Sequence, residues 1–159
     1  MGPVTGAAPR WLDDREQAAW RAYLHASRLL FDALDRQLQR DCGMPHAYYE
    51  ILVRLSEAPG GRLRMSELAD AMLISRSRLS HAAARLEETG RLSREDCPTD
   101  RRGQFAVLTE AGRAALEAAA PGHVDAVRRF LFDALTPERV GQLAEISEAV
   151  LATVRRDAS

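Results

Sequence analysis

A ten-residue segment in the middle of the chain, residues 94–103 (REDCPTDRRG), most constrains its fold. Pro98 fixes one backbone angle, Asp100 can bond back to the local backbone, and Gly103 permits a close or left-handed exit, so the segment predicts a tight turn. Short strand-like runs flank it at 91–94 and 104–108. A hairpin with two arginines at its tip and little apolar surface there is a poor core element, but it suits a nucleic-acid groove.

The residues before this turn predict two short helices. Ser66 can cap a helix over 67–72 and Ser75 can cap a second helix over 76–89, because each hydroxyl would accept a bond from an orphan backbone N–H. Gly90 would close the second helix in the left-handed conformation. Two short helices in this order match the logic of a helix-turn-helix.

One face of the second helix is apolar and the rest is polar and basic. The apolar positions recur at helical spacing and are Leu79, Ala82, Ala83 and Leu86. A helix-turn-helix presents the N-terminal residues of its second helix to base edges in the major groove. We therefore predict DNA contacts by Ser75, Arg76, Ser77, Arg78, Ser80, His81 and Arg85. The hairpin that follows makes the unit a winged helix-turn-helix.

The order and spacing of several motifs resemble the MarR family of bacterial transcription regulators. These motifs are Ser66-Glu67-Leu68-Ala69, Ser75-Arg76-Ser77, 85–90 (RLEETG), Asp100-Arg101-Arg102 and 108–113 (LTEAGR). The resemblance implies an obligate homodimer on a palindromic double-stranded DNA site, often released by a small molecule or an oxidant. It also implies that Asp100 braces the hairpin and that Arg102 enters the minor groove. We expect Arg101 to touch phosphate or to brace the hairpin.

Helical periodicity continues on both sides of this unit. A first long helix is expected from about residue 13 to 40, and a second from about 46 to 57. After the hairpin, Thr109 caps a further helix, which Pro121 must kink or interrupt. The Thr-Pro pair at 136–137 then caps and begins a last helix.

This pattern predicts a mainly α fold with a small β-hairpin wing, in which a winged helix-turn-helix sits on a helical dimerisation platform. The terminal helices carry more apolar surface than one small DNA-binding module needs. They either complete the monomer core or interlock with a second copy, and two-fold DNA-binding proteins need a platform that fixes half-site spacing. We predict a disordered tail at 1–12, dimerisation helices at 13–45 and 109–156, and a DNA-binding lobe at 46–108.

Aromatic and polar residues gather in the first two expected helices and at their junction. The candidates for binding a small-molecule effector are Trp20, Tyr23, His46, Tyr49 and Glu50. Aromatic walls with a few polar groups suit a small aromatic or anionic compound. The alternative is that these are packing residues with polar tips at the surface, and that His46 is a cap or turn residue. In the resembling family, ligands often lie between the dimer platform and the DNA-binding lobe.

A redox trigger through Cys97 or Cys42 is a competing interpretation. Glu95 and Asp96 lie beside Cys97, and their charges disfavour the reactive thiolate. Cys42 lies at a helix C-terminus, where the helix dipole also disfavours a thiolate. The two cysteines have neither a disulfide framework nor a metal-ligand spacing.

Several function classes are excluded by what the sequence lacks. It has no Gly-rich phosphate loop, no His-x-x-x-His or Cys-x-x-Cys pattern and no nucleophile–base pairing, so we expect no enzyme, no cofactor and no metal. It has no apolar run that could span a membrane and no signal-peptide layout, so the expected compartment is the bacterial cytoplasm.

Charge is distributed unevenly along the chain. The formal net charge is −1, but residues 62–102 hold nine arginines against seven acidic residues. We predict a DNA-binding transcription regulator, a dimeric repressor of a palindromic operator that a small aromatic or anionic ligand releases. The alternatives are a redox-responsive regulator and a protein-interaction module that has lost DNA binding, although the arginines of the hairpin and the second helix argue against the latter.

Overall fold

The structure is a computed structural model that describes residues 9–98 and 100–157, and for Arg101 and Arg102 it describes the backbone alone. Its elements in chain order are α1 (Asp14–Cys42), α2 (His46–Glu57), a 3-10 turn η1 (Pro59–Gly61), β1 (Arg62–Arg64), α3 (Met65–Ala71), α4 (Arg76–Glu88), β2 (Leu92–Cys97), β3 (Asp100–Leu108), α5 (Glu110–Phe130), a 3-10 turn η2 (Phe132–Ala134) and α6 (Pro137–Asp157). The predicted mainly α fold with a small hairpin wing is confirmed. Most of the predicted tail lies outside the described residues.

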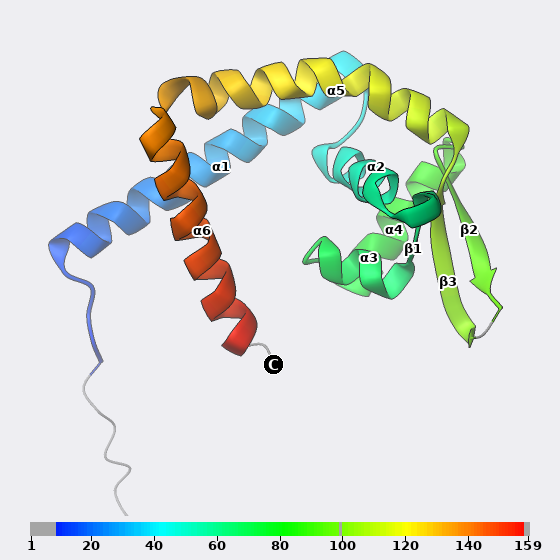
Figure 1. The fold of residues 1–159 in the computed structure, drawn as a ribbon, viewed down its shortest axis with the longest axis horizontal. Helices are drawn as coiled ribbons and strands as arrows, with labels where there is room; N and C mark the ends of the chain where they lie inside the picture. The colour runs from blue at the N-terminus through cyan, green and yellow to red at the C-terminus, as the bar shows by residue number, and fades with distance from the viewer. Residues whose placement is uncertain (1–8, 99, 158–159) are drawn as a thin grey trace, which may run out of the picture.

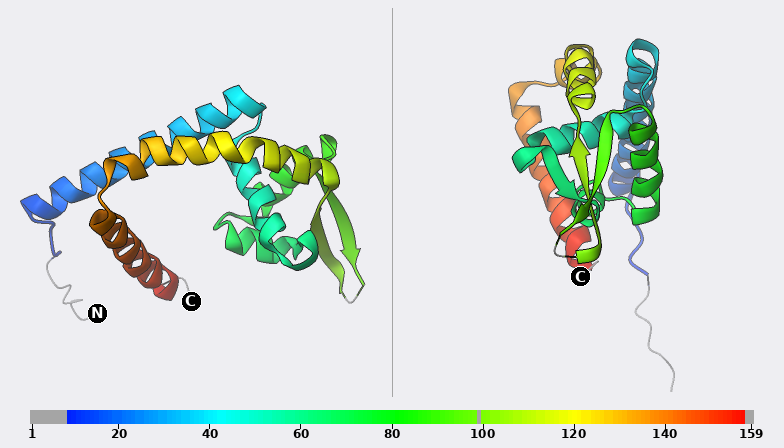
Figure 2. Two further views of the ribbon diagram at one scale, coloured as in Figure 1. Left: turned by 45° about the horizontal axis from the view of Figure 1, so that its top comes forward. Right: turned by 90° about the vertical axis from the view of Figure 1, so that its right-hand side faces the viewer.

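The elements form a lobe and a long helical arm (Figure 1). Helices α2, α3 and α4 and the three strands gather in the lobe, while α1 and α5 run side by side away from it. Helix α6 turns back from the far end of α5, and the left view of Figure 2 shows the lobe and the arm from another side. The arm therefore carries the N-terminal and C-terminal parts of the chain, and the lobe carries its middle.

The buried core lies mainly in the lobe. Its largest fully buried side chains are Leu38, Met44, Ile51, Leu52, Leu55, Leu68, Leu79, Leu86 and Leu92. The apolar face predicted for the second short helix is buried as expected, with Leu79 and Ala83 at 0% exposure in α4. Burial of this face fixes α4 to the lobe and leaves its polar face outward.

The hairpin is longer than the sequence predicted. Strands β2 and β3 pair from Leu92↔Leu108 to Cys97↔Asp100, with a register shift between Asp96 and Cys97. The predicted ten-residue turn is wrong, because most of it continues the two strands, and of its described residues only Pro98 lies in a turn. A third strand, β1, was not predicted. It pairs antiparallel with β3, and the strand order is β1-β3-β2.

Single residues set most helix ends as expected. The Ser75 hydroxyl accepts a bond from the Arg78 backbone N–H at 3.3 Å, and the Thr109 hydroxyl accepts one from the Gly112 N–H at 3.0 Å. Gly90 has a φ of 68°, in the left-handed region that ends α4.

The predicted cap of α3 is wrong. Helix α3 begins at Met65, so Ser66 lies inside it and Arg64 is the N-cap residue. The Glu67 carboxylate accepts a hydrogen bond from the Arg64 backbone N–H at 3.1 Å. This side chain from the first turn of the helix thus satisfies the backbone N–H of the N-cap residue. A glutamate at this position replaces the serine hydroxyl in the capping role.

Helix α5 continues through Pro121 from Glu110 to Phe130. The expectation of an interruption is wrong, and the alternative of a bend fits, since the helix changes direction along its length in both Figure 1 and Figure 2. Proline removes one backbone hydrogen bond. Packing of α5 against α1, where Ala119 and Ala126 are buried, keeps the helix whole.

The arm leaves a broad apolar surface open. Helix α6 has no buried residue, and its exposed apolar side chains are Ile146, Val150, Leu151 and Val154. Helix α1 exposes Trp20, Tyr23, Leu29 and Phe31 in the same way. The surplus apolar surface inferred from the sequence is therefore present on this chain and is not covered by its own core.

Candidate nucleic-acid interface

The polar face of α4 is open to solvent. Ser75 and all six residues predicted to contact DNA on this helix are exposed; they are Arg76, Ser77, Arg78, Ser80, His81 and Arg85. Arg85 pairs with Glu88 on its own helix at 2.8 Å, and this hydrogen bond raises the pKa of the Arg85 guanidinium. The first turns of α4 thus present hydroxyls and guanidinium groups that can reach outward.

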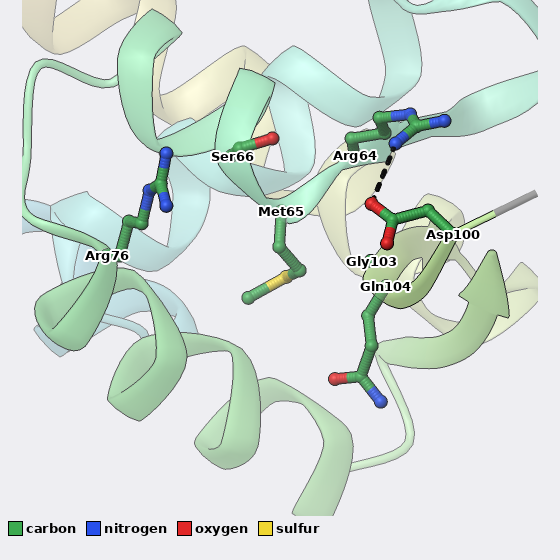
Figure 3. A pocket seen from close by; sticks show the side chains of 7 residues that line it. All are labelled: Arg64, Met65, Ser66, Arg76, Asp100, Gly103 and Gln104. Carbon is green, nitrogen blue, oxygen red and sulfur yellow. Dashed lines mark ion pairs between the residues drawn. The ribbon is translucent and has the colours of Figure 1, made fainter.

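A groove separates the start of α4 from the hairpin. It has a volume of about 360 Å³ and is lined by Arg64, Met65, Ser66, Arg76, Asp100, Gly103 and Gln104. Figure 3 shows Arg76 on one side, Gln104 and Asp100 on the other, and the start of α3 between them. A second hollow of about 170 Å³ shares several of these residues and adds Ser80 and Arg94. One continuous basic and polar depression therefore joins the helix to the hairpin.

Asp100 lies at the tip end of β3 and faces the start of α3. Its Oδ2 atom lies 3.5 Å from Nη1 of Arg64 (Figure 3). A Cβ atom at position 103 would lie 2.8 Å from the same oxygen, so Gly103 gives the carboxylate room. This geometry agrees with the close exit predicted for Gly103. The side chains of Arg101 and Arg102, both predicted to contact DNA, lie outside the described part of the structure.

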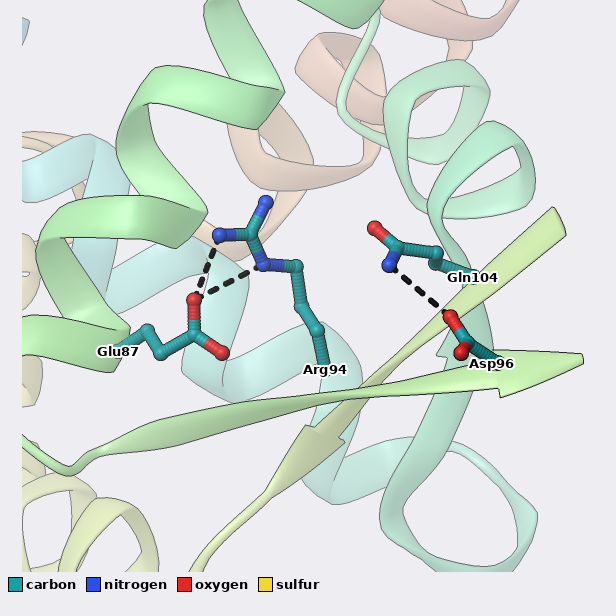
Figure 4. A network of polar contacts seen from close by, with 4 residues as sticks. All are labelled: Glu87, Arg94, Asp96 and Gln104. Carbon is teal, nitrogen blue, oxygen red and sulfur yellow. Dashed lines mark hydrogen bonds and ion pairs between the residues drawn. The ribbon is translucent and has the colours of Figure 1, made fainter. Parts of the chain in front are cut away.

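The root of the hairpin is tied to α4. Arg94 of β2 donates to Oε2 of Glu87 at 2.9 and 2.6 Å, and this hydrogen bonding lowers the pKa of the Glu87 carboxyl (Figure 4). Further along, Gln104 of β3 donates to Asp96 of β2 at 3.2 Å. These contacts join the last turn of the helix to one strand and the two strands to each other.

The sequence did not predict four residues of this groove: Arg64, Met65, Arg94 and Gln104. Arg94 and Gln104 lie within the runs that flank the predicted turn, and these runs were interpreted only as strands. Arg64 belongs to the three-residue strand β1, which is too short to show a periodicity. The Arg-Leu-Arg alternation at 62–64 was the only local signal.

A second cleft lies where the lobe meets the arm. Its volume is about 340 Å³, and it is lined by His46, Tyr49, Glu50, Val53, Arg54, Glu57 and His123. Three of the five predicted effector residues, His46, Tyr49 and Glu50, are thus brought together. The other two, Trp20 and Tyr23, do not line it; they stack on each other along α1 with ring centroids 6.3 Å apart and remain more than half exposed.

Two histidines and a tyrosine meet at this cleft. The His123 ring centroid lies 4.5 Å from that of Tyr49 and 5.4 Å from that of His46. Burial raises the pKa of Tyr49, while burial and the nearby His46 lower the pKa of His123. The His46 backbone N–H donates to Asp35 at 2.8 Å, which fits its predicted place at a turn. His123 was missed, because it follows the proline expected to break α5.

The cysteines differ in exposure. Cys97, the last residue of β2, is buried at 5% exposure, and Cys42 is partly buried. Within residues 9–98 and 100–157, no cluster of three or more His, Cys, Asp or Glu side chains could hold a metal ion. None of the helices in these ranges is long and apolar enough to cross a membrane.

Comparison with known proteins reveals close relatives. The MarR family model matches residues 43–103. The solved structure of Sco3205, a MarR family transcriptional regulator from Streptomyces coelicolor in complex with DNA, is 60% identical over 90% of each chain, with a TM-score of 0.88. AbsC, a MarR family transcriptional regulator from the same organism, is 46% identical over 92% of this chain and 99% of its own, with a TM-score of 0.87.

More distant structures share the fold. A mutant MarR from E. coli complexed with operator DNA is 21% identical over 88% of this chain and 99% of its own, with a TM-score of 0.76. No curated protein matches the sequence. The identity and coverage of the two Streptomyces structures show that the chain belongs to the MarR family of transcriptional regulators.

Proposed function

We propose that this chain is a DNA-binding transcription regulator that represses as a homodimer on a palindromic operator until a small aromatic or anionic compound releases it. The observation that carries the proposal is the groove between the exposed basic start of α4 and the hairpin. The relative that is 60% identical was crystallised with DNA, which supports this use of the surface. The organisation we propose is a DNA-binding lobe at 46–108 and dimerisation helices at 13–45 and 109–156.

Helix and hairpin would read DNA in different ways. Arg76 and Arg78, at the start of α4, would meet base edges in the major groove, where each bidentate contact discriminates bases by about 1–3 kcal/mol. Arg102 would enter the flanking minor groove, whose negative potential attracts arginine with little base coding. Affinity and sequence preference would therefore depend on different residues.

We expect Arg102→Ala to weaken binding on every sequence and to lower the salt dependence of affinity by about one unit of log slope, because a counterion-releasing contact is lost. Arg76→Ala and Arg78→Ala should instead change the preference among operator variants. Asp100→Ala should also weaken binding on every sequence, but by less than Arg102→Ala, because it loosens the hairpin that carries Arg102. The measurement is a salt titration of affinity on a duplex from the gene's own upstream region and on scrambled DNA.

Arg15→Ala is the matched control, since it removes one exposed charge from the second residue of α1. This helix begins at the end of the arm that is distant from the lobe (Figure 1). The control variant should leave both affinity and salt slope unchanged. If Arg102→Ala behaves like this control while folding and dimerisation are intact, the hairpin does not bind DNA as proposed. If the wild-type chain binds neither duplex, the chain is a protein-interaction module and not a DNA-binding regulator.

The effector would bind in the cleft lined by Tyr49, Arg54 and His123. This cleft joins α2 of the lobe to α5 of the arm, so a compound held there would bias how the two parts meet. The cleft also holds Glu50 and Glu57, and the Glu50 carboxylate lies 4.0 Å from Nη2 of Arg54. A small aromatic anion would stack on the aromatic rings and compete with Glu50 for the Arg54 guanidinium. Burial of Cys97 removes the exposure that a redox-sensing thiol needs, which argues against release by an oxidant that acts at Cys97.

We expect an aromatic carboxylate from a small panel headed by benzoate to weaken DNA binding by about 5–150-fold at saturation, the usual range of allosteric coupling. Arg54→Ala should abolish this response while leaving DNA affinity without the compound unchanged. Tyr23→Ala should keep the response, because Tyr23 does not line the cleft. A response lost in Tyr23→Ala and kept in Arg54→Ala would move the effector site to α1.

A further inference from the structure

Strand β1 presents two arginines to one face of the hairpin. Arg62 and Arg64 are two residues apart in a strand, so they share a face. Phe105 of β3 lies between them: its ring centroid is 4.1 Å from Cζ of Arg62 and 5.6 Å from Cζ of Arg64. Two guanidinium groups and one aromatic ring thus bind the edge strand to the middle of the hairpin.

Each arginine also pairs with an acid at a different height of the hairpin. Arg62 reaches Glu95 of β2 at 3.3 Å, opposite Phe105 in the β2–β3 register. Arg64 reaches Asp100 at 3.5 Å, at the tip end of β3. Of these two contacts, the one made by Arg64 lies nearer the tip, where the arginine proposed to enter the minor groove is located.

Arg64 is also the residue from which the helix-turn-helix starts. It is the N-cap of α3, and its backbone N–H donates to Glu67 at 3.1 Å. Its side chain lines the groove together with Arg76 at the start of α4. A single residue therefore connects α3, which packs against α4, to the part of the hairpin that would reach the minor groove.

We infer that Arg64 is a positioning residue for DNA binding, which holds the hairpin tip at a fixed distance from the helix-turn-helix through its contact with Asp100. The inference rests on the proposed function. An isolated two-stranded hairpin is marginally stable, and a hairpin that swings freely must be ordered when it binds. Holding it in place beforehand raises affinity without any new contact to DNA.

Loss of the contact between Arg64 and Asp100 should affect DNA binding more than folding stability. The side chains of Arg64 and Asp100 are 35% and 48% exposed, and exposed ion pairs contribute little to folding stability. The competing explanation is that Arg64 contacts a phosphate directly, since it lines the groove. The two explanations predict different losses of affinity on DNA with and without the flanking minor-groove segments.

Two duplexes separate these explanations. The long duplex includes the minor-groove segments that flank the operator, and the short duplex ends before them, so that only α4 can bind. We expect Arg64→Gln to weaken binding by about tenfold on the long duplex, where a pre-ordered hairpin matters, and by less than about twofold on the short one. A direct phosphate contact beneath α4 would weaken binding on both.

Arg62→Gln is the matched control. It removes the same charge from the same strand and the same ring, but Arg62 does not line the groove and its partner Glu95 lies nearer the root. It should change affinity by less than about twofold on either duplex. The double variant Arg64→Gln with Asp100→Asn should lose less affinity than the two single losses added together, because the two residues share a contact.

Thermal unfolding and sedimentation of each variant should match the wild type. Equal loss on the two duplexes, additive loss in the double variant, or an unchanged affinity of Arg64→Gln on the long duplex would each overturn the inference. Wild-type protein that binds neither duplex would overturn the proposed function, and the positioning role with it. The first three outcomes leave the proposed function standing.

Discussion

Gly112→Ala will destabilise the chain strongly. Gly112 is the third residue of α5, and its N–H donates to the Thr109 hydroxyl at 3.0 Å. A Cβ atom there would overlap the backbone carbonyl oxygen of Arg91 and lie 2.8 Å from Cδ1 of Leu108. A clash with backbone cannot be relieved by a change of rotamer, so α5 must move away from the link between α4 and β2.

Overpacking of this kind costs about 1–3 kcal/mol, and we expect the upper end because the obstructing atom is fixed. A loss of about 3 kcal/mol lowers the melting temperature of a chain of this size by about 6–12 °C. Circular dichroism during heating measures the change. The loss should appear as lower free energy of unfolding with the same helical content below the transition.

Gly141→Ala provides the control, because Gly141 lies inside α6 with no atom within 4 Å of an added Cβ. Alanine has the higher helix propensity, so this change should be neutral or stabilise the chain by up to about 1 kcal/mol. Equal melting temperatures for the two variants would show that α5 shifts freely and that the close approach at Gly112 is dispensable.

The double substitution Ile146→Glu with Val150→Glu will dissociate the proposed dimer. The two residues lie one turn apart on α6 and are 63% and 51% exposed on the single chain. Burying an aliphatic side chain contributes about 1.5–3 kcal/mol. With two changes in each of two copies, the loss is at least about 6 kcal/mol, or about four orders of magnitude in the dissociation constant.

Analytical ultracentrifugation at micromolar concentration should find the wild type as a dimer and the double variant as a monomer. DNA affinity should fall with it, since a monomer can hold only one half-site. Glu148→Gln, on the opposite side of the same helix, should leave the dimer intact. A monomeric wild type would contradict the proposed dimerisation by these helices. A dimeric double variant would place the interface away from α6.

Local structure could be predicted wherever one residue determines the backbone. Ser75, Thr109 and Gly90 mark the ends of α4 and the start of α5 because a hydroxyl or a missing Cβ acts on its immediate neighbours. The same reasoning failed at Ser66, where two capping solutions compete within four residues. The helix that follows strand β1 begins two residues earlier than predicted, with Arg64 in place of Ser66 as the N-cap residue, and Glu67 completes the cap.

Contacts between distant parts of the sequence could not be predicted in this way. Arg64 and Asp100 meet because β1 adds to the edge of the hairpin, and nothing local reveals a three-residue strand. His123 reaches the cleft because α5 continues through Pro121. In both cases tertiary packing decides against the local preference, so these parts of the cleft and of the groove could not be predicted from the sequence.

Because α5 is one continuous helix, a tilt at one of its ends moves the other end. The Thr109 hydroxyl donates to the Gly90 carbonyl at 2.7 Å, so the first turn of α5 is fastened to the end of α4. A helix of 21 residues is about 30 Å long, so a tilt of about 10° at its far end moves its first turn by about 5 Å. Two half-sites lie about 34–36 Å apart on one face of DNA. The operator would then bind only those dimers in which the tilt of the two α5 helices sets the two copies of α4 at the spacing of the half-sites.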